Sequence, residues 1–458
     1  MIDTKNYFVK VNISYSVWEY ILRISTISLF SIICFIIFGN DGDALSSFIW
    51  STVAFLFITI FSTLVLLKNQ RWVWFFVLAY LIKTIFGLLH YLYFIDPEYF
   101  QSGMYKPLTW EFEGVYDQII VSAHDKIKHG ILYYQFYEGG VNHQEIISLI
   151  SIPFVYFGDY VLTINSINSF YSLLISINIL LISKYQFNFN NSALKYVAIT
   201  TAYFPISLIP SLLHRDIVGL ALMSTGITLV LFSKRVITKY FMLIIACYLF
   251  YLHRTIYPVI LLLAFTIDSV IFQNFRSKGK EIFYKVGIVI VGIILFPIII
   301  NYSNTEANES LAGGIFNFNI LFIPLKLILG LIGPFPWLQF LLYEKIPAYA
   351  YQLQDYLQGT LNVALVAIII LFWKKYLIKD NFNLLNITGV LIIISGVFNA
   401  FMHMSYVAIG FVFLLPWLFT EIKISTLKKI YFYVFFALLF LNLVVFAFFG
   451  NLGIKSLI

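Results

Sequence analysis

Apolar residues occur along this chain in long runs that short polar or basic segments separate. The runs are about 15 to 23 residues long, the length that an α-helix needs to cross the hydrocarbon core of a bilayer. They predict spans at 17–39, 45–67, 72–95, 161–183, 194–212, 215–233, 239–252, 255–273, 284–302, 359–373, 384–401, 405–420 and 428–449. The pattern therefore predicts an all-α polytopic membrane protein, with about 12 to 14 transmembrane helices in a single membrane domain over residues 1–458.

Two further apolar segments do not fit a simple series of crossings. Counting 146–160 as a span would invert every later loop, and its Pro153 and Gly158 favour a re-entrant or interfacial hairpin. The segment 320–336 has Lys326 near its middle and prolines towards both ends, which favours the same interpretation. Irregular backbone at membrane depth is tolerated where it lines a cavity, so both segments suggest a cavity at the outer face.

Two long loops are expected on that outer side, at 96–145 and 301–358. The first contains WEFEGVYDQIIVSAHDKIKHG, with charged residues on one helical face and Val115, Ile119, Ile120 and Ile127 on the other. This pattern predicts an amphipathic helix along the membrane surface. The second loop brackets the re-entrant segment 320–336.

The composition and the placement of charge agree with this topology. Hydrophobic residues make up 61% of the chain and charged residues 11%, whereas a soluble chain would carry about a quarter charged residues. Basic clusters occupy alternate loops and mark the cytoplasmic side, while most acids and all seven histidines fall on the other side. The net charge of +7 is thus explained by membrane topology, and we expect no nucleic-acid partner.

The chain carries no familiar signature of a soluble enzyme or a metal cluster. Cys34 and Cys247 both fall inside predicted spans, which predicts neither a disulfide framework nor a metal site. The first apolar run lacks a small-residue cleavage site, so we expect a span there and not a signal peptide.

Two His-Arg pairs, His214-Arg215 and His253-Arg254, interrupt the apolar runs. A cation near bilayer depth costs at least about 3 kcal/mol and usually faces a cavity or a partner. Two guanidinium groups suit a phosphate or pyrophosphate, which arginine grips with paired hydrogen bonds, so all four residues are candidate substrate ligands. The alternative for each arginine is an interfacial side chain that reaches the lipid headgroups.

The candidate catalytic groups are Glu113, Asp117 and His403. Glu113 and Asp117 are four residues apart in the predicted surface helix and project from one face. A carboxylate in a partly dry cleft has a raised pKa and can act as a general base towards a sugar hydroxyl. His403 lies at the outer end of a span and could serve as a base or donor. The alternative for Glu113 and Asp117 is a solvent-exposed helix face without catalytic function. The alternative for His403 is an ordinary histidine at the membrane interface.

Several segments together resemble the O-antigen and capsule repeat-unit polymerases (Wzy-type), within the broader GT-C-like class of membrane glycosyltransferases. They are VYDQIIVSAHDKIKHG, LLHRDIVGLALMSTGITLVL, FYLHRTIYPVILLLAF and GPFPWLQF, and Arg215 with Gly226 matches an Arg, ten residues, Gly pattern described for such polymerases. The pattern is not repeated from Arg254, where position 265 is Phe.

The resemblance implies a bacterial inner-membrane enzyme with a periplasmic active face and no metal or cofactor. It would transfer a glycan from undecaprenyl pyrophosphate onto a lipid-linked repeat unit, and it would work with a chain-length regulator protein. Arg215 and Arg254 would hold the donor pyrophosphate, and Asp117, Glu113 or His403 would deprotonate the acceptor.

Two other functions remain open. A GT-C enzyme that adds one sugar from a polyprenyl-phosphate-sugar donor would use the same arginines. A lipid-linked oligosaccharide flippase would instead place charged groups along a central path.

Overall fold

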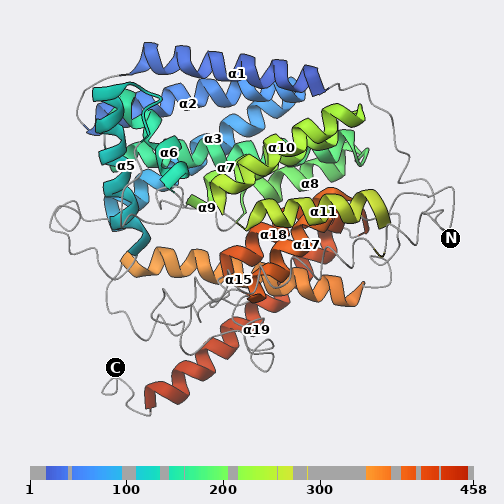
Figure 1. Ribbon diagram of the computed structural model, residues 1–458. Helices are drawn as coiled ribbons and strands as arrows, with labels where there is room; N and C mark the ends of the chain where they lie inside the picture. Colours follow the sequence, from blue (N-terminus) through green and yellow to red (C-terminus); the bar gives the residue numbers. More distant parts are fainter. Residues whose placement is uncertain are drawn as a thin grey trace. The chain divides into compact units, whose positions relative to one another are not determined.

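The computed structural model describes residues 17–39, 44–94, 110–134, 144–158, 160–204, 215–254, 256–271, 286, 347–372, 383–398, 404–421 and 424–451. All regular structure in these ranges is helical (Figure 1). Five of the described helices are long and apolar enough to cross a membrane, and six shorter ones are also apolar. The prediction of an α-helical membrane protein is confirmed at this level, and the single-domain prediction stays a prediction.

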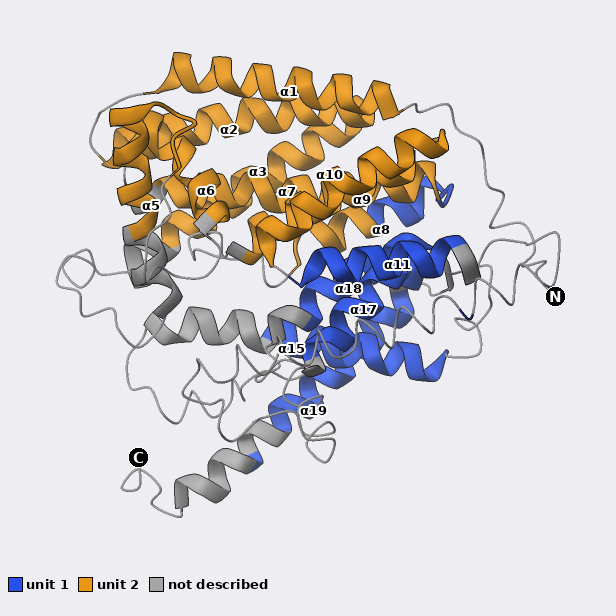
Figure 2. Ribbon diagram, in the orientation of Figure 1, with its two compact units in different colours: residues 1–10, 187–196, 256–458 blue, residues 11–186, 197–255 orange. Residues whose placement is uncertain are grey.

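The chain divides into two compact units (Figure 2). The first described here comprises residues 11–186 and 197–255. Its helices are α1 (Val17–Phe38), α2 (Ala44–Leu67), α3 (Gln70–Phe94), α5 (Trp110–His129), α6 (Gln144–Phe157), α7 (Val161–Tyr185), α9 (Arg215–Phe232) and α10 (Val236–His253). A further helix, α8 (Asn191–Ala202), belongs partly to this unit.

Helix α7 forms the centre of this unit, because it packs against α2, α3, α6 and α9. Of its most apolar window, 89% is buried, against 11% for α1. The polar residues of α7 are buried as well, at zero exposure: Thr163, Asn165, Ser166, Asn168, Ser169, Ser172, Ser176, Asn178 and Ser183. Four of them hydrogen-bond to neighbouring helices: Asn165, Ser166, Ser176 and Asn178. Asn178, for example, accepts from the Tyr20 hydroxyl at 2.7 Å and donates to Ser224 at 3.1 Å.

The other unit comprises residues 1–10, 187–196 and 256–458. Its described helices are α11 (Tyr257–Ile271), α15 (Pro347–Leu371), α17 (Leu384–Phe398), α18 (Met404–Glu421) and α19 (Ile424–Asn451). Helices α17 and α18 approach closely where Gly389 and Gly410 meet, since a Cβ on either glycine would lie 2.6 Å from the other's carbonyl oxygen. Small residues allow this kind of close helix packing in membranes.

Most helix boundaries agree with the predicted spans to within a few residues, but α8 and α15 differ. Helix α15 begins at Pro347, whereas the predicted span begins at 359, so its first turns fall in the segment expected to be a loop. Helix α8 is shorter than predicted. It ends at Ala202, whereas the predicted span runs to 212. Pro205 follows in the sequence and disfavours helical backbone at the residue before it. At 1.5 Å per residue α8 is about 18 Å long, too short to cross the hydrocarbon core alone. The predicted segments 284–302 and 320–336 lie outside the described residues, except for residue 286.

The segment 146–160, predicted as a hairpin, has no turn at Pro153, because residues 144–157 form the single helix α6. Its re-entrant or interfacial placement stays a prediction. Pro153 lies inside the helix, and the helix ends just before Gly158, whose φ of +79° suits glycine. At about 21 Å, α6 is also shorter than the hydrocarbon core. One face of α6 is buried, since Ile146, Ile150 and Phe154 are covered where α6 packs on α5 and other helices.

Candidate functional site

Helices α9 and α10 form an antiparallel hairpin that positions the candidate site. The turn at residues 233–235 joins them at one end, and α9 begins and α10 ends at the other, which we call the open end. Two glycines of α9 let the helices approach. A Cβ on Gly226 would lie 3.1 Å from the Cα of Ala246, and a Cβ on Gly219 would overlap the ring of His253. Gly226 therefore has a packing role, independent of any sequence pattern.

Three ionisable side chains meet at the open end. Asp216 Oδ1 lies 3.5 Å from His253 Nε2 and 3.9 Å from Arg254 Nη2. All three residues are buried, with 6% of Asp216, 1% of His253 and 8% of Arg254 exposed. One carboxylate is thus shared by an imidazole and a guanidinium in a largely dry environment. Ionised side chains are buried away from water only when they are paired with an opposite charge or hydrogen-bonded.

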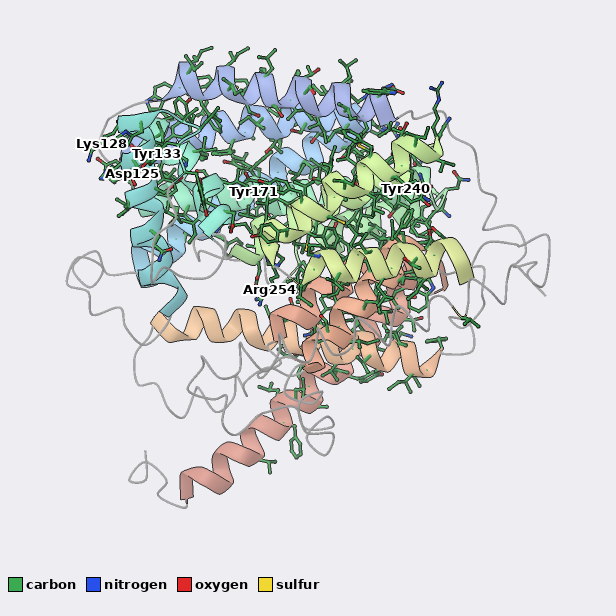
Figure 3. The ribbon with its side chains drawn as sticks, in the orientation of Figure 1. Asp125, Lys128, Tyr133, Tyr171, Tyr240 and Arg254 are labelled. Carbon is green, nitrogen blue, oxygen red and sulfur yellow. The ribbon has the colours of Figure 1, made fainter. Side chains whose placement is uncertain are left out.

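The local backbone explains how Arg254 reaches this position. Helix α10 ends at His253, and Arg254 caps it with extended backbone (φ −154°, ψ 139°) while its N–H donates to the Phe250 carbonyl at 3.1 Å. Figure 3 shows the Arg254 side chain at this end of α10. His253, in the last helical turn, lies instead against Gly219 of α9. Arg254 is therefore the cation that terminates the hairpin, and His253 is packed within it.

For each of the other predicted site residues, either the structure describes the backbone alone or the residue lies outside the described part of the chain. Arg215 begins α9, so its backbone lies at the open end next to Asp216, but its side chain is not described. His214 and His403 lie outside the described residues. Glu113 and Asp117 are helical residues of α5, as predicted, and their side chains are likewise not described. Of the predicted site residues, His253 and Arg254 are thus brought together, through Asp216.

Helix α5 is formed as predicted, but its buried face matches the predicted apolar face only in part. The face that packs on α6 contains Ile119, Ser122, Ala123 and Lys126, whereas Ile127 is 60% exposed. The Lys126 ammonium donates to the Tyr133 carbonyl and to the Ser148 hydroxyl, both at 2.7 Å. Burial lowers the pKa of Lys126, partly offset by the charge of Asp125. This lysine therefore ties the turn after α5 to α6.

Among the described residues, sequence reasoning did not predict the burial of Arg23, Lys126 or Lys83, of which Lys83, in the middle of α3, is the most buried. It is 1% exposed, and its ammonium lies 6.0 Å from the centre of the Tyr203 ring, just beyond the end of α8. At the next residue of α3, Asn165 of α7 donates to the Thr84 carbonyl at 2.9 Å. The signal was present in the sequence, because Lys83 is a single charge inside the apolar run LAYLIKTIFGLL.

The two cysteines are free, as predicted. In the part of the chain that the structure describes, no cluster of three His, Cys, Asp or Glu side chains could hold a metal ion. Comparison with protein-family models, with curated proteins and with solved structures finds no match to this chain.

Proposed function

We propose that this protein is a surface-polysaccharide polymerase of the bacterial inner membrane. It would transfer a glycan from undecaprenyl pyrophosphate to a lipid-linked repeat unit at the periplasmic face, together with a chain-length regulator protein. The observation that carries the proposal is the cluster of Asp216, His253 and Arg254 at the open end of the α9–α10 hairpin. A buried arginine at the end of an apolar helix is costly unless it serves an anionic ligand or partner.

Arg254 is suited to bind the donor pyrophosphate. Its separation of 3.9 Å from Asp216 exceeds hydrogen-bond length, so charge attraction orients the guanidinium without a short bond. A pyrophosphate carries more charge than a carboxylate and accepts paired hydrogen bonds from arginine, so it would compete for the same cation. Arg215 would add a second cation from the first residue of α9.

The transfer reaction then needs charge stabilisation and a base. The acceptor hydroxyl oxygen forms a bond to the anomeric carbon of the donor glycan, and the bond from that carbon to the pyrophosphate oxygen breaks. Arg254 and Arg215 would stabilise the charge that develops on the departing undecaprenyl pyrophosphate. Asp117, Glu113 or His403 would accept the hydroxyl proton. His253, at 1% exposure, would act as a positioning residue that holds Asp216 beside Arg254. A single-sugar GT-C transferase would use these groups in the same way.

A second candidate function is flipping of a lipid-linked oligosaccharide, and Lys83 is the observation that favours it. A flippase needs polar groups at membrane depth, and Lys83 and the polar residues of α7 are buried inside the helical bundle. Lys83 is thus a buried charge that does not belong to the cluster of Asp216, His253 and Arg254.

The proposal can be tested in a strain whose surface polysaccharide depends on this chain. The polysaccharide would be compared on gels for the deletion strain carrying wild type, Arg254→Ala, Arg254→Lys or Arg235→Ala. Arg235 is the matched control, because it is exposed at the other end of the same helix. We expect Arg254→Ala to reduce the ladder to single repeat units and Arg235→Ala to preserve it.

Arg254→Lys should give a weakened ladder, since lysine keeps the charge but not the paired donors. A full ladder with Arg254→Ala would contradict the proposal. An intact ladder with lighter rungs in the deletion strain would indicate a side-branch transferase. Loss of even the single unit there would indicate a flippase.

A further inference from the structure

Three tyrosines and one carboxylate lie close together near the site. We call Tyr134, Glu145, Tyr248 and Tyr251 the tyrosine–glutamate cluster. Tyr134 follows the turn after α5, Glu145 lies in the first turn of α6, and the other two tyrosines lie on α10. Helix α6 packs on both α5 and α10, and the Tyr251 hydroxyl lies 3.5 Å from Glu145 Oε1. The cluster is thus assembled from three elements of one compact unit.

The rings of the cluster are accessible, in contrast to the adjacent site residues. Tyr134 is 44% exposed, Tyr248 60% and Tyr251 41%. His253, two residues after Tyr251, is buried. Tyr251 and His253, two residues apart at the end of α10, therefore lie on different faces of the helix: His253 belongs to the ion cluster and Tyr251 presents its ring.

Electrostatics supports the proximity of these four groups. The pKa of Tyr134 is raised first by partial burial, then by the charge of Glu145 and by the neighbouring hydroxyls of Tyr251 and Tyr248. Ordinary interfacial tyrosines place their hydroxyls separately towards the headgroups. Here the Tyr251 hydroxyl lies 3.5 Å from the Glu145 carboxylate, and Tyr134 is close enough to Glu145, Tyr251 and Tyr248 to interact with all three electrostatically, an arrangement that the aromatic belt of a membrane protein does not require.

The chemistry of the cluster matches a sugar ring. An exposed aromatic ring offers a flat apolar surface to the C–H face of a pyranose, and an ionised carboxylate only accepts hydrogen bonds, as from sugar hydroxyls. The 3.5 Å separation of Tyr251 and Glu145 is long beside the usual value of about 2.7 Å for O–H···O. The carboxylate therefore retains strong acceptor capacity for a ligand hydroxyl. A negatively charged sugar would be repelled by Glu145.

We propose that the tyrosine–glutamate cluster is a binding subsite for an uncharged sugar unit of the glycan chain. The inference deepens the proposed function, on which it rests, by naming a second contact for the substrate. The cluster holds the sugar by stacking and hydroxyl contacts, while Arg254 holds the pyrophosphate. A glycan that bears free hydroxyls and no acidic group at this unit is the preferred ligand.

The test is direct binding of a glycan without its lipid and pyrophosphate. The probe is the repeat-unit oligosaccharide released by mild acid from the lipid-linked intermediate of the same strain, titrated calorimetrically into purified full-length protein in detergent. We expect Tyr251→Ala to weaken binding by about tenfold, because an aromatic contact is lost. Glu145→Gln should weaken it by about tenfold as well, because a hydrogen bond to a charged group is lost. Tyr251→Phe should retain most of the affinity through its ring.

Two control variants separate this inference from the proposed function. Tyr240→Ala removes another exposed tyrosine of α10, near the helix start, and should bind the probe like wild type. Arg254→Ala should also bind it normally, because the probe lacks pyrophosphate.

Equal binding by wild type, Tyr251→Ala and Glu145→Gln would overturn the subsite, as would no binding by wild type. Thermal melting of each variant establishes that it is folded. If Tyr251→Ala is unstable, binding by Glu145→Gln decides the test, because glutamine has nearly the same shape as glutamate. If the probe result holds while Arg254→Ala leaves the surface ladder intact, the polymerase proposal fails and the sugar site stands.

Discussion

The packing of His253 against Gly219 predicts a specific coupling between the two positions. A Cβ on Gly219 would lie 2.2 Å from both Cγ and Nδ1 of His253 and 2.8 Å from its Cβ. Real Cβ atoms do not approach other atoms this closely, so Gly219→Ala must displace the imidazole from Asp216. Removing the whole side chain with His253→Gly should remove the obstacle.

The expected magnitude follows from two opposing terms. Overpacking a filled site costs about 1–3 kcal/mol. Replacing glycine by alanine inside a helix contributes about 1 kcal/mol of stability. Gly219→Ala should therefore lower the free energy of unfolding by about 0–2 kcal/mol in wild type and raise it by up to about 1 kcal/mol in the His253→Gly background. The resulting coupling energy is about 1–3 kcal/mol, within the range for residues in contact.

The assay is a double-mutant cycle on the unfolding of the purified protein in detergent. Gly226→Ala is the matched control on the same helix, because its new Cβ would meet Ala246 and not His253. Its effect should be equal in the two backgrounds. If Gly219→Ala also changes stability equally in both backgrounds, His253 does not occupy the position described here.

Three further predictions concern the remaining polar contacts of this unit, each followed by the unfolding midpoint in detergent. Asp216→Asn should destabilise the protein by about 3 kcal/mol, because it leaves two buried partners without their carboxylate, and an unchanged midpoint would contradict the ion cluster. Burial lowers the pKa of Lys126, so the unfolded chain binds more protons between that lowered pKa and the ordinary lysine pKa. Stability should therefore rise with pH across that window, and Lys126→Met should remove this component of the slope; an identical slope in the variant would refute it. Asn178→Leu should cost about 2 kcal/mol through its lost hydrogen bonds to Tyr20 and α9, and a gain in stability would show that they contribute nothing.

The helices were largely predictable because an apolar run long enough to cross a bilayer is a local property of the sequence. Helix α10, predicted at 239–252, is observed at Val236–His253. Helix α6 was not predictable in this way. A proline in an apolar segment is compatible with a hairpin turn and also with a continuous helix, and Pro153 lies inside a helix here. Its burial among other helices depends on tertiary packing, which hydropathy does not report.

The candidate site was predictable in its residue types but not in its pairing. Arg254 and His253 were evident as polar residues between apolar runs, whereas the sharing of Asp216 depends on how α9 and α10 pack. The buried serines and asparagines of α7 are a similar case, because periodicity does not reveal which neighbouring helix accepts their hydrogen bonds. Lys83 is visible in the sequence as a charge, but it lies inside an apolar run and not at the predicted outer face.

The most direct test of the account is whether Arg254 binds the lipid pyrophosphate. Binding of undecaprenyl pyrophosphate would be measured by native mass spectrometry on purified wild type, Arg254→Ala and the control Arg235→Ala, in the same detergent. The account predicts equal binding by wild type and Arg235→Ala and binding weaker by about tenfold or more for Arg254→Ala, the loss expected for a charge-assisted contact. Equal binding by all three proteins would contradict the central claim.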